Sequence, residues 1–436
     1  YNPAKASNLD EVVTPPYDVI DANAQEGFYE RHPNNIIRLE YGRTLPRDNE
    51  INNRYTRASA DLSAWLKEEV LVPETAPSLY YYEQEFSLAG ERIIRSCCIC
   101  GVKLEPYEKG IVLPHEETMP KHKADRLELM RACKANFSPV FSLYADQEKM
   151  VDRILRQAIG DREPDINFTG SNGEAHRMWV IQDAGAISKA QEAMADRRIF
   201  IADGHHRYET ALNYKMEREG HSCCSSSADE AYNYVMMTLV NLYDPGLVIL
   251  PTHRLVKNVS GFDRSRLIEQ LKENFSVKEY PLAADRSNFK DFLGIMGEHG
   301  KPQHGNTKQN VFGLYTGDNK LYLLSLMKER DLTGIMPQDK PPGWQRLDVA
   351  VLHTLIIEKY LGICGKLRAN AEHITYTQEE EGALAAVDRG EYQLAFFLNP
   401  TLVEEVTEVA AQGEKMPQKS TFFYPKFITG LVINPL

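Results

Sequence analysis

The sequence contains no apolar run close to the ~20 residues that a helix needs to cross a bilayer, so a helical membrane protein is excluded. The residues after Tyr1 read NPAKASNLDEVV and lack both the basic n-region and the apolar h-region of a secretory signal. We therefore expect no membrane partner, no secretory signal and a cytoplasmic location.

Positive charge is also scarce. The 436 residues include 50 Lys and Arg against 62 Asp and Glu, which gives a formal net charge of −12. A protein that binds DNA or RNA through the phosphate backbone needs clustered positive charge, so we expect no DNA partner. The negative net charge of the whole chain does not exclude a local basic pocket for a small anion.

Cysteines are few, and their 7 positions are odd in number and clustered, which is typical of reduced thiols rather than of a disulfide framework. Cys97 and Cys100 form one CxxC, but a structural zinc site needs a second pair at a related spacing. The alternation in RIIRSCCICGVKL predicts a strand with its thiols inside. Metal or redox use of these thiols is the alternative.

Three familiar motifs are missing as well. The sequence has neither GxxxxGK[ST] of the P-loop nor GxGxxG of the dinucleotide-binding fold. His115-Glu116 is not followed by the second histidine of HExxH, which argues against a zinc protease. A phosphate site in this chain therefore needs another architecture.

The order of predicted strands and helices indicates an α/β chain (α+β mixed), and its length favours two or three compact units. We place the main boundary near residue 250, with a core domain that carries insertions over 1–250 and an α+β domain over 251–436. Among the individual elements we expect a strand over 34–43, helices over 54–71 and 123–137, a hairpin over 78–104 and a buried strand over 232–242.

The densest chemical signal is the stretch 198–215, RIFIADGHHRYETALNYK, which predicts a buried strand, a tight turn and a helix. Asp203 can cap that helix, and Gly204 permits a sharp bend. The first turn of a helix offers free N–H donors and partial positive charge, and Arg207 can bind two phosphate oxygens at once. A capped helix with solvated histidines is the alternative. The residues predicted to bind phosphate are Gly204, His205, His206 and Arg207.

A second cluster, VLPHEETMPKHKADR over 112–126, combines carboxylates with cations. A carboxylate near cations can act as a general base for a hydroxyl when the geometry brings the two together. Charged residues ahead of a helix are also commonly solvated, so this cluster alone leaves both interpretations open.

PHEE at 114–117 and DGHHR at 203–207, in this order, resemble the ParB/sulfiredoxin-like superfamily and, within it, the free-serine kinases. The chain departs from them in spacing, because residues 146–198 form an insertion ahead of the DGHHR strand. Over nearly its whole length the chain resembles the domain-of-unknown-function 1015 family, through TPPYDVI, HEET, KADRLELMRACKANFSP, IADGHHRYETAL, LPTHRLV and MPQKSTFFYPKFITGLVI. The resemblance implies a ParB/sulfiredoxin-like phosphate-binding core.

The two clusters and the resemblance together imply a small-molecule kinase that phosphorylates a hydroxyl. Free L-serine is the preferred acceptor, and ATP, ADP or pyrophosphate is the donor. Glu116 would be the general base with Glu117 as the fallback, His206 would neutralise developing charge, and Asp203 would hold Mg²⁺ through water or orient the acceptor. The residues predicted to contact substrate are His115, Lys123, Arg126, Asp18, Arg38 and Lys419.

Two other classes of function stay open. A nucleotide-binding regulatory or partition protein of the ParB type would be retained on DNA at moderate salt, which a kinase would not. A phosphatase or other hydrolase would use the same anion pocket with water in place of the serine hydroxyl, and product analysis would separate it from a kinase. The sequence does not indicate an oligomeric state.

Overall fold

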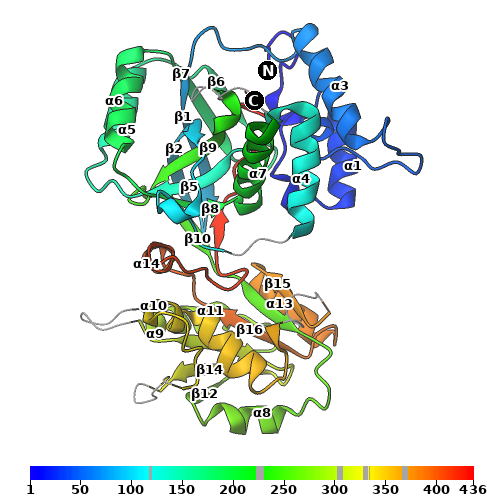
Figure 1. The fold of residues 1–436 in the computed structure, drawn as a ribbon. Coiled ribbons are helices and arrows are strands. Elements are labelled where there is room, and N and C mark those ends of the chain that lie inside the picture. The colour runs from blue at the N-terminus through cyan, green and yellow to red at the C-terminus, as the bar shows by residue number, and fades with distance from the viewer. Residues whose placement is uncertain (117–119, 222–229, 302–307, 328–331, 333, 366–371) are drawn as a thin grey trace. The chain divides into compact units, whose positions relative to one another are not determined.

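The chain forms a mixed α/β fold with several sheets and divides into two compact units (Figure 1). The first unit contains residues 1–248 and 423–436, and the second contains residues 249–422. The assignment of the last residues to the second domain is wrong for 423–436, because this segment packs into the first unit. The computed structural model describes residues 1–116, 120–221, 230–301, 308–327, 332, 334–365 and 372–436.

The first unit is built on an eight-stranded mixed sheet. Its strands are β1 (Leu79–Leu88), β2 (Glu91–Lys103), β3 (Val112–Pro114), β5 (Val140–Tyr144), β6 (Ile166–Thr169), β7 (Ala175–Ile181), β8 (Ile199–Asp203) and β9 (Tyr234–Asn241). Their order in space is β3-β8-β5-β9-β2-β1-β7-β6. β3 pairs with β8, and β5 with β9, in parallel, whereas the other neighbours are antiparallel. β1 and β2 form the predicted hairpin.

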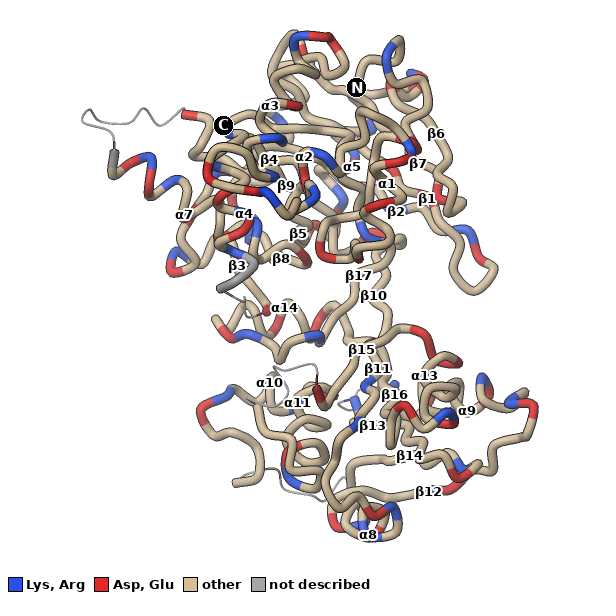
Figure 2. Tube along the Cα trace, turned by 90° about the vertical axis from the view of Figure 1, so that its right-hand side faces the viewer, with Lys and Arg blue, Asp and Glu red and all other residues tan. Residues whose placement is uncertain are grey.

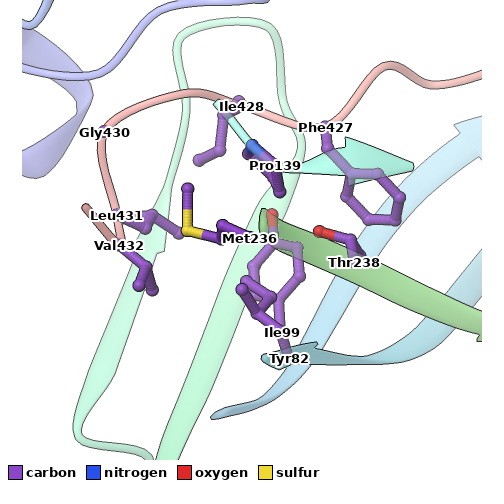
Figure 3. Close-up of a pocket in the computed structure, with 10 residues that line it drawn as sticks. All are labelled: Tyr82, Ile99, Pro139, Met236, Thr238, Phe427, Ile428, Gly430, Leu431 and Val432. Carbon is purple, nitrogen blue, oxygen red and sulfur yellow. The ribbon is translucent and has the colours of Figure 1, made fainter. Parts of the chain in front are cut away.

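Side chains of this sheet alternate between its two faces, as the period of a strand requires. Val235, Met237 and Leu239 of β9 join a core with α5 (Met150–Ile159), α6 (Ala184–Met194) and α7 (His205–His221). Met236 and Thr238 point to the other face, where the C-terminal segment and Tyr82 enclose a small cavity with them (Figure 3). β9 is therefore covered on both sides, which explains its nearly continuous hydrophobicity.

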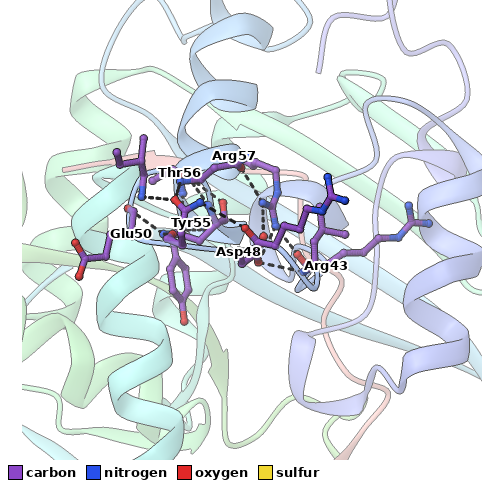
Figure 4. Close-up of polar contacts among 12 residues, drawn as sticks. Arg43, Asp48, Glu50, Tyr55, Thr56 and Arg57 are labelled. Carbon is purple, nitrogen blue, oxygen red and sulfur yellow. Dashed lines mark hydrogen bonds and ion pairs between the residues drawn. The ribbon is translucent and has the colours of Figure 1, made fainter.

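A second helical layer stands beside α7 (Figure 1). It consists of α1 (Ala22–Arg31), α2 (Ile37–Glu40), α3 (Arg54–Lys67) and α4 (Pro120–Cys133), each in contact with the next, and α4 contacts α7. α3 begins at a capping box, in which the Asn53 side chain accepts the N–H of Thr56 and the Thr56 hydroxyl accepts the N–H of Asn53 (Figure 4). Arg57 then pairs with Asp48 at 2.7 Å, which fixes the preceding loop. The predicted helices over 54–71 and 123–137 are confirmed, with earlier C-terminal ends.

The strand predicted over 34–43 is wrong, because this segment forms the short helix α2. The Asn35 side chain accepts the N–H of Ile37 at 2.9 Å, a local bond that favours a turn over an extended chain. Ile36, Leu39 and Glu40 are buried as well as Ile37, so the segment is enclosed on more than one side. Apolar residues on both faces of a short segment do not distinguish a helix from a strand.

The remaining elements of the first unit are short. They are the single helical turns η1 (Leu9–Glu11), η2 (Tyr17–Val19), η3 (Tyr107–Lys109) and η4 (Ala231–Asn233), and the paired strands β4 (Ala135–Asn136) and β18 (Asn434–Pro435).

The second unit contains a six-stranded sheet in which all neighbouring strands are antiparallel. Its strands, in spatial order, are β12 (Phe275–Pro281), β14 (Lys320–Leu326), β13 (Val311–Tyr315), β16 (Leu394–Leu398), β11 (His253–Val256) and β15 (Ile374–Thr377). α9 (Phe289–Gly300) and α13 (Glu380–Asp388) share a core with this sheet. The other helices of the second unit are α8 (Arg264–Leu271), α10 (Pro342–Gln345), α11 (Asp348–Val351), the π-helical η5 (Leu352–Glu358) and α14 (Val403–Ala411). β10 (Val248–Leu250) and β17 (Phe422–Tyr424) pair with each other in a separate two-stranded sheet.

The expectation that the thiols of RIIRSCCICGVKL lie inside a strand is confirmed. Cys97 and Cys98 are buried in β2 as free thiols, and Cys100 is half-buried. Lys and Arg are interspersed with Asp and Glu along the trace (Figure 2). Among the described helices, none combines the length and the apolar character needed to cross a membrane.

Candidate active site

The two motifs predicted to carry chemistry follow neighbouring parallel strands. β3 and β8 pair with Val112 opposite Ile199 and Pro114 opposite Ile201. Parallel strands run in the same direction about 4.8 Å apart, so the residues after them, 115–116 and 203–204, emerge at one edge of the sheet. The strand, turn and helix predicted over 198–215 are confirmed, because β8 ends at Asp203 and α7 begins at His205.

Gly204 forms the turn between β8 and α7. Its backbone has a φ of +90°, a conformation that residues with a Cβ rarely adopt. A Cβ at this position would lie 2.8 Å from the Arg207 guanidinium, which donates to Asp203 Oδ2 at 2.9 Å and to the Pro139 carbonyl. Glycine is therefore required both for the backbone conformation and for the close approach of Arg207.

Asp203 is the common partner of two cations. Lys426 Nζ donates to its Oδ1 and Arg207 Nη2 donates to its Oδ2, both at 2.9 Å. Burial alone would raise the pKa of Asp203, but Lys426 and then Arg207 hold it well below its ordinary value. The carboxylate is therefore ionised, and the three side chains together carry one net positive charge.

Asp203 is predicted to hold Mg²⁺ through water or to orient the acceptor, and both roles stay predictions, because its described contacts are with cationic side chains. Each of its oxygens already accepts a hydrogen bond from a cationic side chain. The part of the chain that the structure describes also contains no group of three or more His, Cys, Asp or Glu placed to hold a metal ion. Its contacts make Asp203 the residue that positions Arg207 and Lys426.

His115 and His205 join the two motifs at the sheet edge. Their rings lie edge to face with centroids 4.7 Å apart, and the His115 backbone N–H donates to His205 Nε2 at 3.3 Å. His115 Nδ1 donates to the Ile201 carbonyl at 2.6 Å, and burial lowers the pKa of His115 to about 4. His115 is therefore neutral at pH 7. These two buried rings connect the motifs.

Glu116, the predicted general base, directly follows His115 and is half-buried. His206 is the second residue of α7 and is half-buried too. Both residues therefore belong to the edge where β3 and β8 end, and both retain the solvent access that a reacting group needs. Glu117, the fallback base, lies outside the described residues.

Lys123 and Arg126, predicted to bind an acceptor carboxylate, are tied to carboxylates of the protein itself. Lys123 pairs with Glu209 of α7 at 2.8 Å. Arg126 is buried, donates through Nε and Nη2 to Asp125, and donates through Nη1 to the Glu40 backbone carbonyl at 2.7 Å. These contacts fasten α4 to α7 and α2. They favour a structural role, and acceptor binding by these two side chains stays a prediction.

Glu40 is a buried member of this network that the sequence did not reveal. Its carboxylate accepts the Ser138 hydroxyl at 2.7 Å and lies 3.4 Å from Arg126 Nη1. Burial raises the pKa of Glu40 against the opposing effects of Arg126 and Ser138. Glu40, Arg126, Arg207 and Thr210 line a small cavity beside α7, so the network reaches the residues of the phosphate turn.

Three further residues predicted to contact substrate, Asp18, Arg38 and Lys419, lie in different surroundings. Asp18 is exposed in η2. Burial alone would lower the pKa of Arg207, but Asp203 and then Asp18 raise it. Asp18 therefore lies within electrostatic reach of the turn. Arg38 donates to the Tyr29 carbonyl at 3.3 Å and stacks on that ring, so its contacts are with α1. Lys419 is an exposed residue of the second unit.

Lys426 is the site residue that sequence reasoning missed. It lies 223 positions from Asp203 along the chain, and no local spacing links the two. Its one signal in the sequence is membership in the closing motif MPQKSTFFYPKFITGLVI, in which Lys419 is the predicted residue.

A family model described as a protein of unknown function (DUF1015) matches residues 1–350. The chain belongs to the DUF1015 family. The match covers residues 1–248 of the first unit and continues into the second, so both motifs of this DUF1015 chain lie within it. No match was found among curated proteins.

Several solved structures are similar to this DUF1015 chain. A free serine kinase (E30A mutant) in complex with ADP is 14% identical with a TM-score of 0.35, covering 74% of this chain and 87% of that chain. A conserved hypothetical protein from Pyrococcus furiosus is 16% identical with a TM-score of 0.33, covering 76% and 92%. SbnI from Staphylococcus aureus, with a C-terminal truncation, is 11% identical with a TM-score of 0.34, covering 77% and 87%.

Proposed function

We propose that the first unit is a phosphotransferase that moves a phosphoryl group from a nucleotide or pyrophosphate to the hydroxyl of a small metabolite, with free L-serine as the preferred acceptor. The observation that carries the proposal is the parallel pairing of β3 with β8. Because of this pairing, Glu116 and the cations that share Asp203 belong to one edge of the sheet.

The donor phosphates would bind at the first turn of α7. Backbone N–H groups of a first helical turn have no partner within the helix, and the helix dipole favours an anion there. Arg207 supplies a planar pair of donors, and the net positive charge of Asp203, Arg207 and Lys426 complements the phosphates. Phosphoryl transfer mainly requires positioning and neutralisation of charge, and these groups would supply both.

Glu116 would act as the general base. It would accept the proton of the acceptor hydroxyl while the hydroxyl oxygen attacks the terminal phosphorus of the donor. One O–P bond forms at the acceptor and one breaks at the bridging oxygen of the donor. The leaving group is therefore ADP, AMP or orthophosphate when the donor is ATP, ADP or pyrophosphate, respectively.

The proposal is tested by incubating the full chain with L-serine and each of the three donors, and measuring O-phosphoserine by mass spectrometry. Glu116→Gln should lower turnover by about 10²–10⁴-fold, because the base is lost while the donor site is intact. Glu192→Gln, at an exposed position on α6, is the matched control and should turn over normally. Near-normal turnover of Glu116→Gln would contradict the assignment of the base.

The same assay separates the rival functions. Orthophosphate released from the donors at a rate that serine does not change would indicate a hydrolase. Donor binding without any product, across a panel of hydroxyl amino acids, would indicate a nucleotide-binding protein that performs no chemistry. Phosphorylation of another member of the panel would keep the phosphotransferase and correct its acceptor.

A further inference from the structure

The last segment of the chain is anchored on the sheet of the first unit. Phe427 packs edge to face on Phe141 of β5 with ring centroids 4.8 Å apart, and Thr429 pairs with Thr14 through the backbone. Ile428 and Leu431 close the small cavity over Met236 and Thr238 (Figure 3). The residues just before Phe427 therefore have a defined place at the end of β5, next to β8.

Two buried side chains fix three successive carbonyls of this segment. Arg95, which is 0% exposed, donates to the carbonyls of Tyr424 at 3.2 Å and Pro425 at 2.6 Å. Gln84 donates to the carbonyl of Lys426 at 3.2 Å and accepts from Arg95 at 2.5 Å. A buried cation is costly unless it is hydrogen-bonded, and here the bonds of Nη1 and Nη2 define the backbone that carries Lys426. This arrangement directs one particular lysine toward Asp203.

Asp203 is shared by two cations, because Lys426 Nζ and Arg207 Nη2 each lie 2.9 Å from one of its oxygens. The side chains of Lys426, Asp203 and Arg207 are 16%, 20% and 12% exposed, so the cluster reaches solvent at the sheet edge. An anion that approaches from solvent would therefore meet both cations.

We infer that Lys426 is a phosphate-binding residue of this site, supplied by the C-terminal segment and held in place by Asp203. The inference rests on the proposed function, because it names a further ligand contact of the same site. The ammonium group has three N–H donors, so it can bond a phosphate oxygen while it keeps Asp203 as a partner. Arg207 would bind the phosphates through its planar fork, and Lys426 would act on them as a compact point charge.

The test compares the affinity of the full chain and its variants for ATP, ADP and pyrophosphate by isothermal titration calorimetry. Lys426→Met should weaken binding by about 10- to 100-fold, the effect of losing one hydrogen bond to a charged group, and Lys426→Arg should recover most of it. Lys189→Met, which removes an exposed lysine from α6, is the matched control and should bind as wild type does. Arg207→Ala removes the guanidinium of the phosphate turn, so its donor affinity measures the contribution of that turn separately from that of Lys426.

A second measurement needs no variant. Acetylation of the wild-type chain, read lysine by lysine by mass spectrometry, should be slowed at Lys426 by pyrophosphate and unchanged at Lys189.

The outcomes distinguish a failure of this inference from a failure of the proposed function. Weaker binding in both Lys426→Met and Arg207→Ala, with protection of Lys426, supports the inference. Weaker binding in Arg207→Ala alone, or no protection of Lys426 in a chain that binds pyrophosphate, overturns the inference and leaves the proposed function standing. No affinity of wild type for any of the three donors overturns the proposed function, and the inference fails with it.

Discussion

The neutrality of His115 leads to a quantitative prediction about acid stability. The ring is 1% exposed, its Nδ1 donates to the Ile201 carbonyl, and burial lowers its pKa from 6.5 to about 4. Between these two pH values the unfolded chain binds a proton that the folded chain does not, so the free energy of unfolding falls as the pH falls. Each pH unit corresponds to about 1.36 kcal/mol, and the full interval therefore to about 3.4 kcal/mol.

The assay is urea unfolding between pH 4 and pH 7. Tryptophan fluorescence in a Trp344→Phe background reports the first unit through Trp65 and Trp179. His115→Asn should lower stability at pH 7, because a buried ring is lost, and should also lose about 2.8 kcal/mol less than wild type between pH 7 and pH 4, where the folded ring is half protonated. The change in slope is the diagnostic quantity, because a packing defect alone would shift the whole curve.

His176 provides the matched control for this slope. Burial lowers its pKa to about 4 as well, and it bonds to the Tyr82 hydroxyl rather than to the candidate site. His176→Asn should therefore flatten the pH dependence by a similar amount and leave pyrophosphate affinity unchanged. If His115→Asn shows the same slope as wild type, the ring is not held neutral by burial, and His115 would then have to be counted among the cations of the site.

The remaining predictions concern stability around the same site. Gly204→Ala should cost about 1–3 kcal/mol and weaken pyrophosphate binding, whereas Gly110→Ala, at φ +68° in open space, should cost about 1–2 kcal/mol and leave binding intact; equal binding in both would contradict the close approach at Gly204. Arg126→Met should cost about 3–5 kcal/mol in urea unfolding because Glu40 is left buried and unpaired, and adding Glu40→Gln should recover part of it; no recovery would contradict the pairing. Asp203→Asn should make the loss of stability in acid less steep than in wild type. In wild type the ionised carboxylate stabilises the fold above the ordinary carboxyl pKa, and this stabilisation is lost as the pH falls below it. Equally steep acid unfolding curves of the variant and wild type would contradict this.

The strand, turn and helix at 198–215 could be predicted because their determinants are local. An apolar run, a capping aspartate and a glycine lie within a few residues of one another, and each acts on its neighbours. The structure adds the reason for the glycine, which is the guanidinium of Arg207 above it. The pairing of β3 with β8, which brings the second motif to the same edge, is not a local property, and only the resemblance between motifs suggested it.

The errors arose where burial or long-range contact overrides local pattern. Residues 34–43 alternate like a strand, but Asn35 starts a turn and the following residues are buried on more than one side. Lys123 and Arg126 look like a free basic cluster in the sequence, yet they pair with Glu209 and Glu40, carboxylates of neighbouring helices. Charge in a sequence does not reveal whether its partner is a substrate or another part of the chain.

The candidate site depends on a segment that lies far beyond both motifs in the chain. β3 and the turn after β8 lie in the first part of the chain, whereas Lys426 follows the whole second unit, residues 249–422. Asp203 and Arg207 can form their pair as soon as β8 and α7 fold, but Asp203 cannot acquire its second cation until the segment 423–436 has been synthesised and bound by Arg95 and Gln84. The two cations therefore meet at Asp203 only once residues 423–436 are present. The second unit is in this sense a long insertion between two halves of one site.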